Sequence, residues 1–361
     1  MVKRAFAALL CLVNGLLITV NVWAENAANR VNHAVILQYH HIATDTPAST
    51  SLSPKVFAQH LDILKQEGYT VWPLPKLVRA LQSDQLIPDR TVVITFDDAY
   101  DDIVLQAAPM LKKHGFPFTV FVSTDFVDRR QPGYMTWDQL RSLKKQGATL
   151  ANHTRSHLHL LRRPEDVGQK QWLQTVREEI DGAEQRIEDE TGEHWRYFAY
   201  PYGEADEALI KAVTAWGYLG FGQQSGAVNK SLLRSGMAPR FPFNQSYKDL
   251  ADFRIKASSM PLPLLKESFP GWVFEDAVKP ELKLTLAPHR GKLSCYASGQ
   301  GSVPIQSLSD NLFMVQVDKP IPVGRSRYNC TLPVAGQPGR YHWHSRMWIR
   351  KRDDGSWYPE P

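Results

Sequence analysis

The sequence predicts an α/β fold, in which parallel strands are covered by helices, followed by a small β-rich domain. Apolar strand-like runs alternate with helix-like segments from about residue 34 to residue 221. Such alternation is typical of a parallel sheet, built as an open sheet or as an incomplete barrel. After about Pro261 prolines interrupt any helix, and short alternating strands follow. That spacing favours a β-sandwich of about 90 residues.

The individual elements follow from local signals. The strands expected in the α/β part cover residues 34–39, 70–72, 91–96, 118–122, 148–151, 197–200 and 218–221. The helices expected between them cover residues 54–67, 76–81, 102–114, 136–146, 167–190 and 206–216. Ser53-Pro54 is a helix start, Thr136 with Gln139 is a capping box, and Gly115 is a helix stop. The later strands are expected at 282–286, 293–297, 313–317, 326–332 and 341–351.

The N-terminal end is predicted to be a secretory signal. Lys3 and Arg4 precede an apolar stretch over residues 5–20, and Val22-Trp23-Ala24 supplies small residues for cleavage. We therefore expect residues 1–24 to be removed from a protein that is exported to a periplasm or secreted, with no stable membrane span afterwards. Uncleaved anchoring is the alternative, because apolar signal regions resemble short membrane spans.

Composition excludes some classes of function. The chain has 361 residues, of which 43% are hydrophobic and 22% charged, which is enough for a large core and more than one domain. Its positive charges are scattered, so no nucleic-acid partner is expected. Removal of the signal leaves Cys295 and Cys330, an even pair that predicts a disulfide in an exported protein.

Two adjacent carboxylates, Asp97 and Asp98, follow the apolar strand of residues 91–96. Strand ends of this kind carry the chemistry of α/β folds. Two like charges in a partly dry site require a cation or strong donors, so the pair indicates a metal. The alternative is that Asp-Asp only caps a helix.

Two histidines after a second strand end strengthen the metal interpretation. His153 and His157 follow the strand at 148–151, and two histidines four apart can reach one ion. With Asp98 they form a two-histidine, one-carboxylate set that leaves positions open for water and substrate, while Asp97 is free to act as a base. A Pro-Tyr-Gly turn around Tyr202 can direct a backbone N–H at an oxygen that becomes negative, although such a turn also occurs without function.

Together these segments resemble the polysaccharide deacetylases with a NodB-type domain, carbohydrate esterase family 4. Thr95-Phe96-Asp97-Asp98 matches the first motif of that family, His153-Thr154-Arg155-Ser156-His157 the second, and Pro201-Tyr202-Gly203 most of the third. Order and spacing match across roughly residues 34–260. The resemblance implies a distorted, incomplete (β/α)7-type barrel over residues 25–262, followed by a β-rich accessory domain over residues 263–361.

Within this family, three segments are most similar to the poly-β-1,6-N-acetylglucosamine deacetylase branch. They are Tyr39-His40, the segment Phe198–Gly203 and Met135-Thr136-Trp137-Asp138. The partner that this resemblance implies is an N-acetylglucosamine-containing polysaccharide.

The resemblance also implies roles for single residues. Asp98, His153 and His157 would hold a divalent metal, most often Zn²⁺, with Co²⁺, Ni²⁺ or Mn²⁺ as alternatives. Asp97 would take a proton from the attacking water, and the Tyr202 N–H would stabilise the oxyanion. His40 matches a first-strand histidine of the branch that would protonate the leaving amine. The alternative for His40 and its neighbour His41 is a polar pair at a strand end.

The chain departs from the family pattern at two positions. Ala99 stands where glycine is usual, at a cost of about 1 kcal/mol if the backbone there has a positive φ. Ala199 stands where many members have an arginine that orients the catalytic carboxylate. Arg240 is a candidate substitute, because a buried guanidinium can form a fork with a carboxylate.

Large aromatic residues are candidates for contact with sugar rings, although most such residues are simply core. The substrate-binding candidates are Trp137, Tyr200, Tyr202 and the neighbouring Pro201, and Trp195 and Trp216 are further aromatic candidates.

The sequence thus predicts an exported metal-dependent N-deacetylase of an N-acetylglucosamine polysaccharide. Two rivals stay open: an esterase that removes O-acetyl groups from a glycan, and a glycan-binding protein with a decayed site.

Overall fold

The structure is a computed structural model that describes residues 30–360. The predicted signal peptide, residues 1–24, lies outside the described residues. Within residues 30–360 no helix combines the length and the apolar composition needed to cross a membrane.

A curved nine-stranded sheet, here called the barrel sheet, forms the N-terminal part of the structure. Its order is β10-β2-β5-β6-β7-β8-β9, with β11 beside β2 and β3 beside β5. The strands are β2 (His33–Tyr39), β3 (Thr70–Val71), β5 (Thr91–Phe96), β6 (Thr119–Val122), β7 (Thr149–Asn152), β8 (Tyr197–Ala199), β9 (Leu219–Phe221), β10 (Ala227–Asn229) and β11 (Phe241–Pro242). All pairs are parallel except β10 with β2. The C-terminal ends of the parallel strands therefore meet at one rim, as the alternating pattern predicted.

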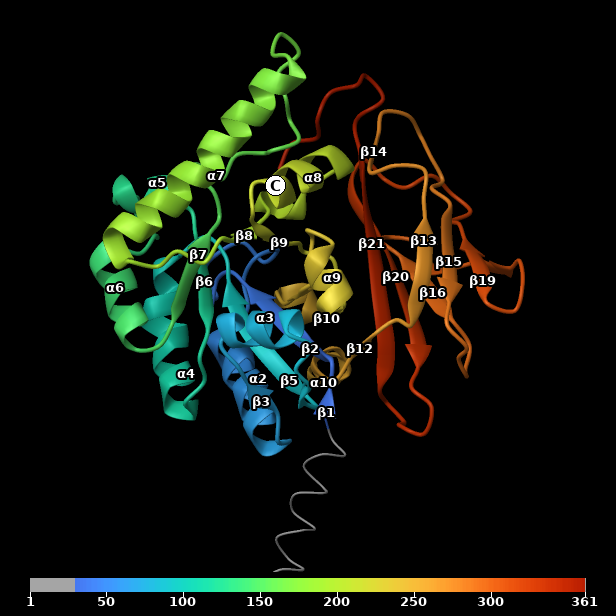
Figure 1. The fold of residues 1–361 in the computed structure, drawn as a ribbon, viewed down its shortest axis with the longest axis horizontal. Helices are drawn as coiled ribbons and strands as arrows, with labels where there is room; N and C mark the ends of the chain where they lie inside the picture. Colours follow the sequence, from blue (N-terminus) through green and yellow to red (C-terminus); the bar gives the residue numbers. More distant parts are fainter. Residues whose placement is uncertain (1–29, 361) are drawn as a thin grey trace, which may run out of the picture.

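Helices cover the outside of the barrel sheet (Figure 1). They are α2 (Pro54–Gln66), α3 (Leu74–Gln82), α4 (Ala108–His114), α5 (Thr124–Asp128), α6 (Trp137–Lys145), α7 (Gln169–Thr191), α8 (Glu207–Ala215), α9 (Lys230–Arg234) and α10 (Leu250–Ala257). The predicted caps are confirmed: the Ser53 hydroxyl accepts from the Val56 N–H, and Thr136 forms its capping box with Gln139. Gly115 ends α4 with φ 69°.

The helix expected over residues 102–114 begins differently from the prediction. Its first part, Ile103–Ala107, is a π-helical turn, and α4 starts only at Ala108. Pro109 gives the physical reason, because proline has no N–H to donate to the Leu105 carbonyl and its ring crowds that carbonyl.

Two further sheets, formed by β12 to β21, make up the C-terminal sheet domain. The six-stranded sheet contains β12 (Met260–Pro261), β14 (Val273–Phe274), β16 (Ser294–Ala297), β17 (Gly301–Val303), β20 (Gly324–Pro333) and β21 (Tyr341–Arg350). The four-stranded sheet contains β13 (Leu264–Ser268), β15 (Leu282–Leu286), β18 (Ile305–Ser307) and β19 (Leu312–Val315). A separate small sheet pairs β1 (Arg30–Val31) with β4 (Ile87–Pro88). A second sheet domain was predicted, but its strands β12, β13, β14, β17 and β18 were not.

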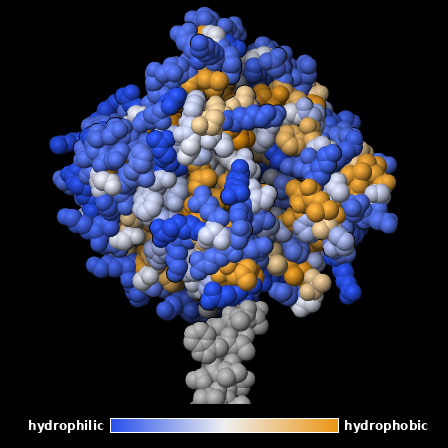
Figure 2. Space-filling model, viewed as in Figure 1, coloured by the Kyte–Doolittle hydropathy of each residue, from blue (hydrophilic) through white to orange (hydrophobic). Residues whose placement is uncertain are grey.

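The C-terminal sheet domain has a core of its own, in which Leu284, Val315 and Trp348 are fully buried. Cys295 on β16 and Cys330 on β20 lie directly opposite each other and form the expected disulfide. The larger apolar patches on the face shown in Figure 2 lie on the side of this domain, whereas hydrophilic side chains cover most of the barrel side.

The six-stranded sheet stands beside α8, α9 and α10 (Figure 1). The Trp343 ring of β21 meets the edge of the Phe241 ring, with centroids 5.2 Å apart. Beyond the end of β20, Arg340 forms a fork with the Asp89 carboxylate at 2.6 and 2.8 Å. Asp89 precedes β5, so this contact lies at the end of the barrel sheet opposite to the rim that carries Asp97.

Candidate active site

The residues predicted to carry chemistry converge at the rim of the barrel sheet. Asp97 and Asp98 follow the fully buried strand β5 directly, and the Asp97 N–H donates to the Tyr39 carbonyl at the end of β2. Asp98 and Ala99 have φ values of 74° and 66°. Ala99 therefore occupies the left-handed conformation in which glycine is favoured, and it is fully buried.

Asp98, His153 and His157 present their side chains to one point. The Asp98 Oδ1 lies 3.2 Å from the Nε2 of His153 and 3.2 Å from the Nε2 of His157. The ligand atoms of the three residues all lie within 4.8 Å of one another. His153 comes directly after β7, and His157 follows in a turn in which the Thr154 hydroxyl accepts from the His157 N–H at 3.0 Å.

These three residues fit a divalent metal. The Asp98 Oδ1 and the His153 Nε2 are buried and have no hydrogen-bond partner among residues 30–360. The other ring nitrogen of His153 is 2.8 Å from the Ala199 carbonyl, so Nδ1 carries the proton and Nε2 keeps its lone pair. Two imidazoles and one carboxylate with a free lone pair are a donor set that zinc and similar ions accept.

The Asp97 carboxylate is held by Arg240 and Gln38, which lie outside the set of three possible metal ligands. The Arg240 guanidinium forms a fork with its carboxylate at 2.7 and 2.8 Å, and the Gln38 amide donates to Oδ2 at 2.6 Å. Asp97 and Arg240 are both fully buried. Burial by itself would raise the pKa of Asp97, but Arg240 and the neighbouring histidines together outweigh it and hold that pKa below its usual value. Asp97 is therefore an ionised carboxylate in a fixed orientation.

The two histidines after β2 differ in their surroundings. His40 Nε2 lies 4.0 Å from the Asp97 Oδ2, and burial lowers the pKa of His40. His41 turns away to Asp102, whose carboxylate lies 2.6 Å from the His41 Nδ1, and its ring stacks on Tyr100 with centroids 3.6 Å apart. Only His40 therefore belongs to the Asp97 cluster.

The Pro-Tyr-Gly turn lies against the same cluster. Tyr202 has a φ of 58°, and its ring meets the edge of the His157 ring with centroids 4.4 Å apart. Within residues 30–360 the Tyr202 N–H makes no hydrogen bond, so it is free to donate to a ligand oxygen. Burial raises the pKa of Tyr202 to about 12, so its hydroxyl keeps its proton at neutral pH.

The other aromatic candidates make their contacts elsewhere. Tyr200 is fully buried and donates its hydroxyl to the Gly236 carbonyl, and Pro201 is also buried, so these two residues shape the turn without facing the rim. Trp137, the first residue of α6, packs in the core, where its indole N–H donates to Asp128 and Arg186 covers its ring. The structure thus does not bring the Tyr200 or Trp137 side chain to the site.

Sequence reasoning missed several residues that support the site. Gln38 could have been noticed as the one amide in the apolar run of residues 34–39. His159, whose ring stacks on Tyr202 with centroids 3.6 Å apart, and Glu204, whose carboxylate lies 3.0 Å from the His159 Nδ1, had no sequence signal beyond their nearness to motif residues.

Comparisons with known proteins show similarity in the part of the chain that carries these residues. Residues 85–221 match the family model described as polysaccharide deacetylase. The Bacillus subtilis protein YxkH is 26% identical over 196 residues, which are 54% of this chain and 66% of that protein. The poly-β-1,6-N-acetyl-D-glucosamine N-deacetylase of Escherichia coli K12 is 24% identical over 260 residues. The matched region covers 61% of this chain but only 38% of the Escherichia coli protein.

A Staphylococcus epidermidis protein of the same name is 25% identical over 55% of this chain and 74% of its own length. Among solved structures, IcaB from Ammonifex degensii superposes with a TM-score of 0.55 and 22% identity, over 63% of this chain and 98% of that one. At such identity the superposition shows the fold alone. Residues 85–221 thus match a polysaccharide deacetylase domain, and the fold around them is similar to that of IcaB.

Proposed function

We propose that this protein is a metal-dependent hydrolase that removes N-acetyl groups from N-acetylglucosamine units of a polysaccharide and releases acetate. The observation that carries the proposal is the convergence of Asp98, His153 and His157 beside Asp97, a carboxylate that other residues orient. The relatives named as poly-β-1,6-N-acetyl-D-glucosamine N-deacetylases support the choice of an N-acetylated glucosamine polymer. A binding protein would have no need for such a cluster.

Asp98, His153 and His157 would hold the metal, with Zn²⁺ as the first candidate and Co²⁺, Ni²⁺ or Mn²⁺ as alternatives. When bound, a divalent ion polarises the acetamide carbonyl and makes a water molecule more acidic. The chain's own residues supply the remaining steps.

In the proposed reaction, Asp97 accepts the proton of the water that attacks the acetamide carbonyl carbon. Arg240 and Gln38 keep its carboxylate in place, and the Tyr202 N–H donates to the carbonyl oxygen as that oxygen becomes negative. Because burial lowers the pKa of His40, its imidazole is neutral before the reaction. The His40 Nε2 lies 4.0 Å from the Asp97 Oδ2, so His40 is within reach of the proton that Asp97 takes up. His40 passes this proton to the leaving nitrogen as the C–N bond breaks. The products are acetate and a free amine on the sugar.

We further propose that the protein is exported and acts in a periplasm or outside the cell. The basic and apolar composition of residues 1–24 supports this location, and so does the disulfide between Cys295 and Cys330.

The test is acetate release by recombinant protein from β-1,6-linked, chitin-type and peptidoglycan-type N-acetylglucosamine oligomers, with O-acetylated xylan as the ester substrate. We expect release from an N-acetylated oligomer, loss of activity with a chelator, and recovery with Zn²⁺ or Co²⁺. The Asp97→Asn variant should keep its metal and lose activity. Metal-loaded protein that releases acetate only from the ester would replace the amide assignment with the esterase alternative. Metal-loaded protein that releases none from any glycan would refute the hydrolase.

A further inference from the structure

The C-terminal segment of the chain returns from the C-terminal sheet domain to the rim of the barrel sheet. Figure 1 shows it crossing from the end of β21 to the neighbourhood of α8 and β8. Tyr358 on this segment is buried and donates its hydroxyl to the Glu204 carboxylate. Glu204 is fully buried and lies only two residues after Tyr202. The sheet domain thus touches the turn that carries the proposed oxyanion donor.

Two guanidinium groups connect the same carboxylate with the C-terminal segment. Arg325 of β20 and Arg162 of the barrel lie 3.4 and 3.5 Å from the Glu204 carboxylate. Glu360 binds both of them, at 2.8 and 3.0 Å for Arg325 and at 3.0 Å for Arg162. Two carboxylates are therefore balanced by two guanidiniums in a partly buried network, and such charge-assisted bonds are stronger and more directional than neutral ones.

The His159, Glu204 and Glu360 ligand atoms also lie close enough together to hold a metal ion. Arg162 and Arg325 already supply two positive charges to these carboxylates, so a cation would meet repulsion there. The cluster is a set of ion pairs between two parts of the protein.

This network bears on the conformation of Tyr202. A φ of 58° is unfavourable for tyrosine and persists only where the surroundings hold it. On one side the His159 ring stacks on the Tyr202 ring at an angle of 6°, and His159 is bound to Glu204. The Arg325 guanidinium lies over the Tyr202 ring, 5.6 Å from its centroid. One support of the turn therefore comes from the barrel, and the other comes from the sheet domain.

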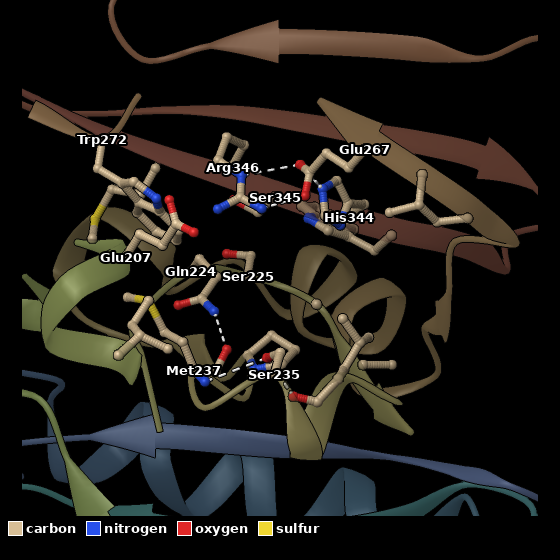
Figure 3. A pocket seen from close by; sticks show the side chains of 18 of the residues that line it. Glu207, Gln224, Ser225, Ser235, Met237, Glu267, Trp272, His344, Ser345 and Arg346 are labelled. Atoms are coloured by element: carbon tan, nitrogen blue, oxygen red, sulfur yellow. Dashed lines mark hydrogen bonds and ion pairs between the residues drawn. The ribbon is translucent and has the colours of Figure 1, made fainter. Parts of the chain in front are cut away.

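The part of the domain interface between α8 and β21 does not support the Tyr202 turn in the same way. Between α8 and β21 the two domains enclose a cavity of about 340 Å³, which Figure 3 shows with Glu207, Gln224 and Arg346 on its walls. The Arg346 guanidinium is paired there with Glu267 of its own domain. Direct contact between the sheet domain and the Tyr202 turn is thus made by the Arg325, Tyr358 and Glu360 network.

We propose that Arg325, Tyr358 and Glu360 are positioning residues for deacetylation, which hold the turn of residues 201–204 so that the Tyr202 N–H faces the reacting carbonyl. This role rests on the proposed function. It makes the C-terminal sheet domain part of the catalytic unit, although no hydrogen bond or ion pair joins its described residues to Asp98, His153 or His157.

The experiment compares Arg325→Ala and Tyr358→Phe with Arg340→Ala in the full-length protein. Arg340 is the matched control, because its fork with Asp89 also joins the two domains but lies at the opposite end of the barrel sheet. With an N-acetylglucosamine oligomer that the wild type deacetylates, we expect Arg325→Ala to lower kcat about tenfold or more, since a lost oxyanion donor costs about 10²- to 10³-fold. Tyr358→Phe should lower kcat less. KM should change less than twofold in both, metal content should stay at the wild-type level, and Arg340→Ala should keep kcat within twofold.

A second measurement does not depend on turnover. Hydrogen–deuterium exchange reports the Gly203 and Glu204 amides, which donate to the Tyr200 and Pro201 carbonyls at 2.9 and 3.2 Å. We expect faster exchange of this segment in Arg325→Ala and Tyr358→Phe, and wild-type exchange in Arg340→Ala.

Unchanged kcat and unchanged exchange in both Arg325→Ala and Tyr358→Phe would overturn the positioning role. Equal losses of kcat in Arg325→Ala and Arg340→Ala would overturn it too. If Arg325→Ala does not fold, Tyr358→Phe decides by the same two measurements, because it removes only one hydroxyl. A wild-type protein without activity would refute the proposed function, while the exchange experiment would still test whether the sheet domain holds the turn.

Discussion

Replacement of Arg240 by alanine should abolish the orientation of Asp97 while leaving the metal ligands in place. The guanidinium is fully buried and donates two hydrogen bonds to Asp97, one of 2.8 Å to the Gly222 carbonyl and one of 3.3 Å to the Thr95 hydroxyl. Removal of one partner of a buried ion pair costs about 3–5 kcal/mol, because the other charge stays buried without compensation. We therefore expect a marked loss of stability and, since a positioned general base contributes about 10²- to 10⁴-fold, a fall in kcat of about 10²-fold.

A double-mutant cycle separates the effect on Asp97 from a general loss of structure. Turnover, metal content and thermal unfolding are measured for Arg240→Ala, Asp97→Asn and the double variant. If Arg240 acts through Asp97, the second substitution should lower kcat by less than about threefold in the Asp97→Asn background. The double variant should also be less destabilised than the sum of the two single variants, because no uncompensated carboxylate stays buried. Metal content should equal that of the wild type throughout.

Wild-type turnover in Arg240→Ala would refute the assigned role. Additive losses in the double variant would show that Arg240 affects catalysis independently of Asp97. Loss of metal from Arg240→Ala alone would show that the fork supports the ligand cluster, which the geometry does not predict.

Three further predictions concern the metal site, acid stability and the disulfide. His157→Ala should lower the bound metal below one half of the wild-type content at equal metal concentration, because one of three ligands is lost, and metal analysis after dialysis checks this. Burial lowers the pKa of His60 from 6.5 to about 3, so the unfolded chain binds more protons below pH 6.5. Stability should therefore fall as the pH falls from 6.5 towards 3, by about 2 kcal/mol at pH 5 from this group, and a His60→Phe variant should show a flatter acid limb in denaturant unfolding. Reduction of Cys295–Cys330, which are 35 residues apart, should cost about 4 kcal/mol, and unfolding with and without reductant measures this difference.

The sequence was sufficient for the architecture because strands and helices carry local patterns. A run such as residues 91–96 is apolar throughout because both of its faces are buried, and capping residues such as Thr136 mark helix starts. Short edge strands such as β14 and β18 lack such patterns, since they are only partly buried and owe their form to pairing with a neighbour. The π-helical turn before α4 also depends on a single proline within an otherwise regular helical pattern.

The chain by itself determined which acids and histidines stand at strand ends, and therefore that Asp97, Asp98, His153 and His157 meet at one rim. Parallel strands impose that meeting, whatever the rest of the fold does. Only the tertiary structure decided how each group is held, because such partners are distant in sequence: Arg240 lies 143 residues after Asp97, and Tyr358 lies 154 residues after Glu204. Folding of the barrel brings the candidate Arg240 to Asp97, whereas packing of the two domains brings Tyr358 to Glu204, a pair for which the sequence carries no local pattern.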